Sequence, residues 1–269
     1  MDILRRELEE IYAGQRLQEE TLDRWALEGY RRSVGRMADM TRGCCVITDA
    51  ASDRCYVYGG AFARLMGWEM QANDERCVTH DDLSCWELVL DSSDEDFIYN
   101  RIHPESLPEK RLLEFEFFKM IDKLPADQKL HHKAVSRFRI QDKEGNYIWV
   151  DNSTQVLCLS PKGMMWLILC IYDLSAYQTP HEGIAPRIKD YRTGKVATLS
   201  LAERKAHILT RREKEILSLI RQGKSSKMIA DELSISRNTI NRHRQNILEK
   251  LSVSNSFEAI TAAESMGLL

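Results

Sequence analysis

Residues 209–217 have the sequence Leu-Thr-Arg-Arg-Glu-Lys-Glu-Ile-Leu, and they begin the part of the chain that decides its fold. Thr210 can accept the amide of Glu213, and the Glu213 carboxylate can reach back to the Thr210 amide, which is the capping box that starts a helix. Apolar residues then recur at helical spacing until Gly223, which can turn the chain. The pattern predicts a helix that packs one face inward.

Two more helices are expected after this glycine. A short one is predicted over residues 225–233, and the sequence Leu-Ser-Ile-Ser at 233–236 allows a tight turn. Ser236 is a good cap for a third helix that continues to Leu251. Two helices joined by such a turn are typical of a DNA-binding module.

The third helix is expected to have one apolar and one polar face. At about 100° per residue, Ile240, Ile247 and Leu251 fall on one line. The opposite side carries amide and guanidinium groups, which match the edges of adenine and guanine. A polar face can also be merely solvated, but such a face is usually rich in Glu and Lys pairs, and this one has almost none. Its side chains are Asn238, Asn241, Arg242 and Gln245.

Several stretches of this region resemble one known family across four helices in order, over about a quarter of the chain. They are residues 209–217, Gly-Lys-Ser-Ser-Lys-Met-Ile-Ala at 223–230, Leu-Ser-Ile-Ser-Arg-Asn-Thr-Ile-Asn-Arg-His at 233–243, residues 246–251, Asn255 and Glu258-Ala259. They closely resemble the LuxR-type (GerE-like) helix-turn-helix. The resemblance implies that the third helix enters the major groove and that the fourth forms a dimer contact, so that symmetric partners bind two half-sites.

The resemblance also implies roles for single residues. Base contacts fall on Asn241, Arg242 and Gln245. Asn241 departs from the family, which usually has Lys there, so one cation near the DNA is lost. The resemblance places phosphate contacts at Lys227, Thr239, His243 and Lys250. Arg211 and Lys224 are further candidates, because their basic side chains lie around the polar face, as those of Lys227 and Lys250 do.

The charge balance supports a division of the chain into parts. From Ser200 to Leu269 there are twelve basic and eight acidic residues, whereas the rest has 26 basic and 33 acidic residues. This asymmetry indicates that one part meets nucleic acid and the other does not. No segment resembles a membrane span or a secretory signal, so a cytoplasmic protein is expected. The seven cysteines form no Cys-x-x-Cys pair, which favours buried reduced thiols.

The middle of the chain predicts an antiparallel sheet with helices on one face. Two short strand-like runs surround a turn at 51–54, and three longer ones follow a helical block. Strands that do not alternate regularly with helices favour an α+β fold. The strand-like runs are residues 44–49, 55–58, 135–141, 147–157 and 164–172.

Parts of this region resemble a PAS domain. The similar segments are 102–107 (Ile-His-Pro-Glu-Ser-Leu), 137–140, 145–150 and 171–175. The resemblance spans roughly residues 40–175 and implies a five-stranded sheet whose helical side can enclose a small-molecule ligand. It indicates no cofactor. Aromatic and aliphatic residues on alternate strand positions are candidate ligand contacts, although such residues are more often core. They are Phe138, Ile140, Tyr147 and Trp149.

The chain is therefore expected to have four parts. A helical segment (1–40) precedes the PAS-like domain (41–175), a linker (176–200) that contains Pro180 and Gly183, and a four-helix DNA-binding domain (201–269). The first segment either packs on the PAS-like domain or forms a dimer seam. His103 is a candidate haem ligand, but its place before Pro104 at a helix start favours a structural or capping role.

This organisation predicts a homodimeric transcriptional regulator that binds double-stranded DNA and whose PAS-like domain senses a signal. RNA polymerase is a further candidate partner. One alternative keeps the DNA-binding part and makes the PAS-like domain a ligand-free dimerisation or protein-docking module. A less favoured alternative makes it an enzyme domain, with its thiols as candidate reactive groups. No catalytic residue and no metal site is predicted, because no hydrolase, metalloprotease or dinucleotide motif is found.

Overall fold

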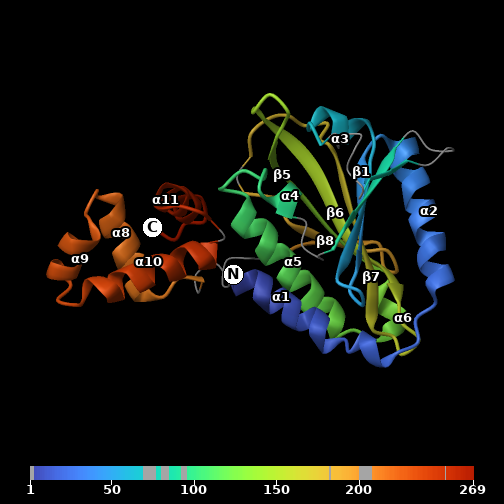
Figure 1. Cartoon of the computed structure of the whole chain (residues 1–269), viewed down its shortest axis with the longest axis horizontal. Coiled ribbons are helices and arrows are strands. Elements are labelled where there is room, and N and C mark those ends of the chain that lie inside the picture. Colours follow the sequence, from blue (N-terminus) through green and yellow to red (C-terminus); the bar gives the residue numbers. More distant parts are fainter. Residues whose placement is uncertain are drawn as a thin grey trace.

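A mixed α/β part and a C-terminal helical part follow each other along the chain (Figure 1). The computed structural model describes residues 3–68, 77–79, 85–91, 96–181, 183–199, 208–251 and 253–269. The strands are β1 (Cys44–Asp49), β2 (Arg54–Gly59), β3 (Cys77–Thr79), β4 (Trp86–Leu90), β5 (His132–Gln141), β6 (Tyr147–Leu159), β7 (Met165–Leu174), β8 (Arg187–Asp190) and β9 (Lys195–Thr198).

In the sequence, helices precede the strands, lie between them and follow them. Those of the first part are α1 (Ile3–Gly14), the 3-10 turn η1 (Leu17–Glu19), α2 (Arg24–Thr41), α3 (Ala61–Leu65), α4 (Asp96–Tyr99), α5 (Leu107–Asp122) and α6 (Ala126–Lys129). Those of the last part are α8 (Arg211–Arg221), α9 (Ser226–Glu232), α10 (Arg237–Leu251) and α11 (Ser256–Ser265).

The described strands form one antiparallel sheet in the order β3-β4-β2-β1-β7-β6-β5-β8-β9. The five predicted strands occupy its centre, but the predicted number of five is wrong, because each edge is extended by two more strands. Those four strands have three to five residues each. Segments this short give no reliable periodicity, so the sequence alone does not reveal them.

The segment predicted as a linker (176–200) contains the last two strands of the sheet. Residues 187–198 form the hairpin of β8 and β9, and β8 pairs with β5. Ile184 and Ile188 are buried in the same core as the central strands. The prolines and glycines that predict a linker occur around these strands, and the apolar contacts of the two isoleucines hold this segment on the sheet.

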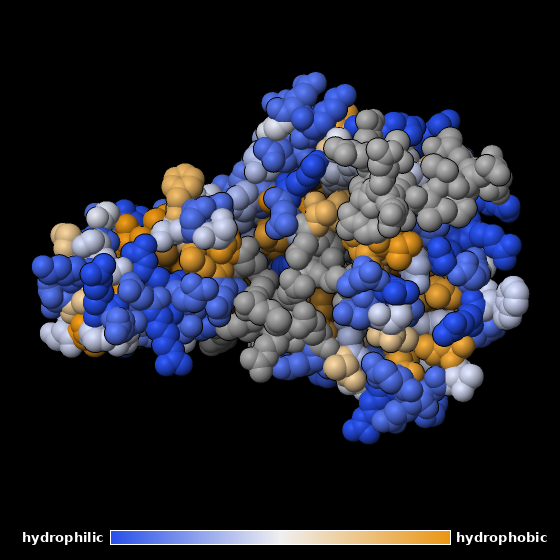
Figure 2. Space-filling view, in the orientation of Figure 1, coloured by the Kyte–Doolittle hydropathy of each residue, from blue (hydrophilic) through white to orange (hydrophobic). Residues whose placement is uncertain are grey.

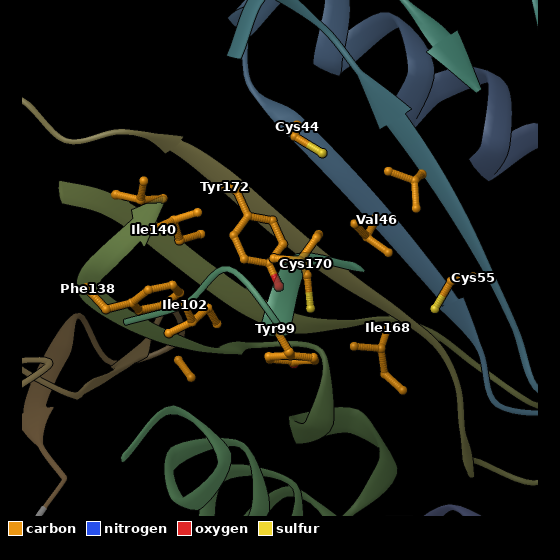
Figure 3. Close-up of a cluster of buried hydrophobic side chains, with 14 of the residues drawn as sticks. Cys44, Val46, Cys55, Tyr99, Ile102, Phe138, Ile140, Ile168, Cys170 and Tyr172 are labelled. Carbon is orange, nitrogen blue, oxygen red and sulfur yellow. The ribbon is translucent and has the colours of Figure 1, made fainter. Parts of the chain in front are cut away.

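The sheet buries both of its faces. Alternate residues of β1 show this, because Cys44 and Val46 join the cluster under α3, α4 and α5, whereas Cys45 and Ile47 join the cluster under α2. Figure 3 shows the first cluster, where Tyr99 and Tyr172 point into the same apolar space. The prediction of helices on one face is therefore wrong, since α2 covers the other.

Contacts between α1 and both α5 and α10 bring the beginning of the chain near its helical end (Figure 1). Gln15, directly after α1, donates to Asp122 of α5 at 2.9 Å and accepts from the Met165 amide at 2.9 Å. The fully buried Leu112 of α5 contacts Leu199 and Ile208. Among the described residues, no helix is both long and apolar enough to cross a membrane.

Candidate DNA-binding surface

Helix α8 begins at the capping box that the sequence predicts. Oγ1 of Thr210 accepts the Glu213 amide at 3.3 Å, and Oε2 of Glu213 accepts the Thr210 amide at 2.8 Å. The same carboxylate oxygen accepts Nζ of Lys250 at 2.7 Å. The end of α10 is thus fixed to the beginning of α8.

The turn between α9 and α10 is built by serines. Oγ of Ser236 accepts the Thr239 amide at 3.1 Å, which confirms the predicted cap of α10. Ser234 has φ of 53°, in the left-handed region that L-residues other than Asn and Asp rarely occupy. Ser225 caps α9 in the same way, accepting the Met228 amide at 3.3 Å. These contacts set the angle at which α10 leaves the turn.

Helix α10 has the two faces that the sequence predicts. Ile240, Ile247 and Leu251 are buried in a core shared with α8, α9 and α11. Asn241 and Arg242 are exposed. Gln245 is also exposed, and its amide donates to Glu249 at 3.2 Å. The space-filling view shows much of the surface over α9 and α10 as hydrophilic (Figure 2).

The predicted phosphate contacts divide into accessible and engaged groups. Arg211, Lys227 and Thr239 are exposed. Lys224 is 2.6 Å from Glu232, a partly exposed pair that can open at little cost. Lys250 differs, because its partner Glu213 is almost completely buried. Its ammonium group therefore has a structural partner that competes with a phosphate.

The remaining phosphate candidate, His243, is half-buried on the flank of α10. Its Nδ1 is buried and has no hydrogen-bond partner among the described residues. A phosphate oxygen can pair with this nitrogen only if the ring turns to expose it and the nitrogen carries the proton.

Two arginines of α10 were missed by the sequence interpretation. Arg237 lies in its first turn and is exposed, like the predicted phosphate contacts Arg211 and Lys227. Arg244 instead donates to Ser226 at 3.3 Å and Ser256 at 2.9 Å, joining α10 to α9 and α11. The position of Arg237 at the start of the helix was an available signal. Nothing in the sequence alone separates the structural Arg244 from its neighbours.

The Glu213 carboxylate remains charged in this setting. Burial raises its pKa, but hydrogen bonds from Lys250 and Thr210 outweigh burial, so that the pKa lies below its ordinary value of 4.5. A negative charge at the first turn of α8 also suits the positive end of the helix dipole. The module is therefore held together by an ion pair that persists at neutral pH.

The four candidate ligand contacts do not come together on one face. Phe138 and Ile140 are completely buried under α5. Tyr147 is paired with Gln141, and Trp149 with Arg139. Directly paired residues share a face, and residues 139 and 141 lie on the opposite face of β5 from Phe138 and Ile140. Tyr147 and Trp149 therefore lie on that opposite face. Tyr147 is 42% exposed, and the Trp149 ring lies against arginine side chains.

His103 makes a local backbone contact, and the Cys45 thiol is buried. Nδ1 of His103 accepts the Glu105 amide at 3.2 Å, in agreement with a local capping role. Burial raises the pKa of the Cys45 thiol to about 12, so this group is protonated at neutral pH and is a poor nucleophile. Within the described ranges, no three His, Cys, Asp or Glu side chains are grouped to hold a metal ion.

Comparison with known proteins agrees with this geometry. The family model described as "Bacterial regulatory proteins, luxR family" matches residues 207–263, which include α8, α9 and α10. The spore germination protein GerE of Bacillus subtilis is 40% identical over 62 residues, which are 23% of this chain and 84% of GerE. The transcriptional regulatory protein DesR of Bacillus subtilis is 42% identical over 93 residues, 33% of this chain and 47% of DesR.

Other matches cover less of the relative or have low identity. The chain spans less than half of DesR and 41% of the response regulatory protein YgeK of Escherichia coli. The solved complex of phage VqmA with DPO has 18% identity and a TM-score of 0.28, over 90% of this chain and 89% of that chain. GerE, by contrast, is matched over most of its length. On that match and on the family model, the chain belongs to the LuxR family of bacterial regulatory proteins.

Proposed function

We propose that the protein is a sequence-specific DNA-binding transcriptional regulator whose PAS-like part senses a signal and controls DNA binding or dimerisation. The observation that carries the first half is the exposed row of Asn241, Arg242 and Gln245 on α10, opposite a completely buried apolar row. Amide and guanidinium groups presented in this way match purine edges in the major groove. Arg211, Lys227 and Arg237 provide accessible cations beside them.

Binding as a homodimer is part of this proposal. A dimer with two-fold symmetry presents two copies of α10 to two half-sites. Helix α11 supports it, because the Phe257 side chain is 78% exposed there. A large apolar side chain at such exposure is suited to a contact with the same helix of a second copy. Contact with RNA polymerase and a cytoplasmic location belong to the same proposal.

A PAS-like sensing domain is supported by the central strand order β2-β1-β7-β6-β5, covered by α3, α4 and α5. Polar groups are buried on this side. Lys110 is completely buried and its Nζ lies 2.6 Å from Oε1 of Glu114, which also accepts the Tyr99 hydroxyl at 2.6 Å. Buried ion pairs are costly to form, which makes this pair a candidate for a functional role.

Two buried atoms on this side of the sheet offer contacts to a signal molecule. Oε2 of Glu114 and Oγ of Ser136 have no hydrogen-bond partner among the described residues. Ser136 pairs with Asn152, and both are buried on the face of the sheet that carries Phe138. Unsatisfied buried polar atoms cost roughly 1 to 3 kcal/mol each, which a ligand with a donor and an acceptor would recover. We place the signal site at these residues together with Phe138 and Ile140.

DNA recognition is tested by comparing Arg242→Ala with Lys227→Ala in full-length protein. Arg242→Ala should lose roughly 1 to 3 kcal/mol of affinity on the cognate site and much less on other sequences. Lys227→Ala should weaken binding to all sequences and reduce its salt dependence. Titrations on cognate and scrambled duplexes at several salt concentrations measure both. An equal loss for Arg242→Ala on every duplex would contradict base recognition by this residue.

The sensing half is tested by native mass spectrometry of the purified full-length protein. A retained small molecule that disappears under denaturing conditions is the expected result, and Ser136→Ala together with Glu114→Gln should reduce its retention. The exposed Glu144→Gln on the β5–β6 turn is the matched control. A bare dimer, together with unchanged DNA binding after addition of cell extract, would favour a ligand-free docking module instead.

A further inference from the structure

A pocket of about 720 Å³ lies on the face of the sheet that α2 covers. It is bounded by η1, the first half of α2 and the turn between β1 and β2. Its volume falls within the roughly 300 to 1,000 Å³ of small-molecule sites. We propose that this pocket is a second ligand site, separate from the signal site under α5, and that it takes a small carboxylate with a flat apolar body.

The floor of the pocket is apolar and held in place. Tyr56 and Trp166 are 6% and 4% exposed, and Leu17 beside them is 2% exposed. Nε1 of Trp166 donates to Oδ1 of Asp49 at 3.0 Å, and Asp49 also accepts the Ser52 hydroxyl at 2.6 Å. Two fixed aromatic side chains provide a preformed surface for a flat ring.

The acidic residues of the wall are already engaged by the protein. Both carboxylate oxygens of Glu20 accept hydrogen bonds, from the Ser160 hydroxyl at 2.9 Å and the Lys162 amide at 3.1 Å. Asp49 is engaged as described above. Glu28 forms an ion pair with Arg31 at 2.5 Å. These contacts leave the wall with little capacity to attract a cation.

The basic residues, in contrast, retain donors. Arg31 is held over the Tyr56 ring at 4.4 Å and bonded to the buried Glu87 at 2.8 Å, so it belongs to the wall. The Arg24 side chain makes no ion pair or hydrogen bond with any residue that the structure describes. Arg54 uses Nε for the exposed Asp91 at 2.9 Å, which leaves its other N–H groups for a ligand. Planar guanidinium groups bind carboxylates in a bidentate manner.

The pocket therefore combines a flat apolar floor with guanidinium donors at its rim. A cationic ligand would meet only carboxylates that already have partners in the protein, and a neutral ligand would form no ion pair with the arginines. A carboxylate on an aromatic body uses both features. Because the pocket is formed by α2 and η1 together with the sheet, its ligand would also hold the N-terminal helices against the sheet.

Ligand-observed NMR on full-length protein tests this site with benzoate, phenylpropionate and indole acetate. At least one is expected to bind saturably, and its methyl ester should bind at least about tenfold more weakly. The double variant Arg24→Gln with Arg54→Gln should weaken carboxylate binding by roughly tenfold or more, since charge-assisted hydrogen bonds are lost. Arg32→Gln, an exposed arginine of α2 outside the pocket, should leave binding unchanged.

Three results would overturn the proposal. They are no saturable binding by any of the three acids at millimolar concentration, equal binding of acid and ester, and equal binding by the double variant and the wild type. Circular dichroism of each variant serves as the control for folding. Dissociation of a dimer by the double variant would overturn the proposal as well, because the pocket would then be a contact between copies. Cognate DNA binding without added carboxylate should be unchanged in the double variant. Failure of the carboxylate-site proposal is therefore distinguishable from failure of the DNA-binding proposal.

Discussion

Arg242 and Arg244 show how the fold gives different uses to the same side chain. Two residues apart on α10, they point in directions separated by about 200°. Arg242 is exposed on the polar face, whereas Arg244 donates to Ser226 and Ser256 and joins three helices. The sequence identified the polar face correctly because its apolar counterpart has strict helical spacing. It could not identify the partners of Arg244, because they come from other helices.

Glu213 gives a prediction for stability against pH. Its pKa is lowered in the folded protein, so its contribution is present above the ordinary value of 4.5 and is lost as pH falls through the lower folded pKa. Glu213→Gln should reduce the stability of the helical part by about 1 to 2 kcal/mol at neutral pH. The difference from the wild type should narrow below about pH 4.5, and hydrogen exchange of α8 and α10 amides measures it.

Glu215 offers a control for this experiment. It lies on the same helix but is exposed and pairs only with Arg212 at the surface. Glu215→Gln should change stability by less than about 0.5 kcal/mol at any of these pH values. A constant difference between wild type and Glu213→Gln from neutral to acid pH would show that the charge of Glu213 is not involved.

At the scale of elements, the helix-turn-helix was predictable because its signals are local. Caps act within a single turn of helix, and the predicted caps at Thr210 and Ser236 are both present. The edge strands β3, β4, β8 and β9 were not predictable, because their stability comes from pairing with distant strands. Strand propensity depends on such context more than helix propensity does.

The turn between α9 and α10 contains a site where a substitution should stabilise the protein. Ser234 has φ of 53°, which costs an L-residue about 1 to 2 kcal/mol, whereas glycine loses only about 0.5 to 1 kcal/mol through chain entropy. Ser234→Gly is therefore expected to stabilise the helical part by about 0.5 to 1 kcal/mol. Slower hydrogen exchange of the α9 and α10 amides would show it.

Ser236 is the matched control in the same turn. It caps α10, so Ser236→Gly should not stabilise the module and should cost a few tenths of a kcal/mol. Equal effects of the two glycine substitutions would mean that backbone strain at Ser234 is negligible.

In the whole molecule, α5 is the element that connects the parts. Its inner side carries the buried Lys110 and Glu114. Glu109 accepts the buried Ile184 amide at 3.0 Å, and Leu112 contacts Leu199 and Ile208 on the way to the helical part. Through α5, a change at the proposed signal site can therefore act on the segment that precedes α8.

Glu109→Ala tests this connection. It would leave the amide of Ile184 buried without its partner, at a cost of about 1 to 3 kcal/mol. We expect faster hydrogen exchange at Ile184 and faster proteolysis between residues 176 and 186, with little change in cognate DNA affinity. Glu144→Ala on the exposed β5–β6 turn is the control. Unchanged exchange at Ile184 would show that Glu109 does not hold this segment.

Local sequence signals were enough to predict the helix-turn-helix, its caps, its buried row and its exposed polar row, because these depend on contacts within a few residues. They also located the five central strands. The width of the sheet, the helix on its second face, and the burial of Ile184 and Ile188 in the core became evident only from the folded structure. The folded structure also separated Phe138 from Trp149 and grouped Lys110 with Glu114 and Tyr99. These features arise from pairing and burial between distant residues, which no local pattern encodes.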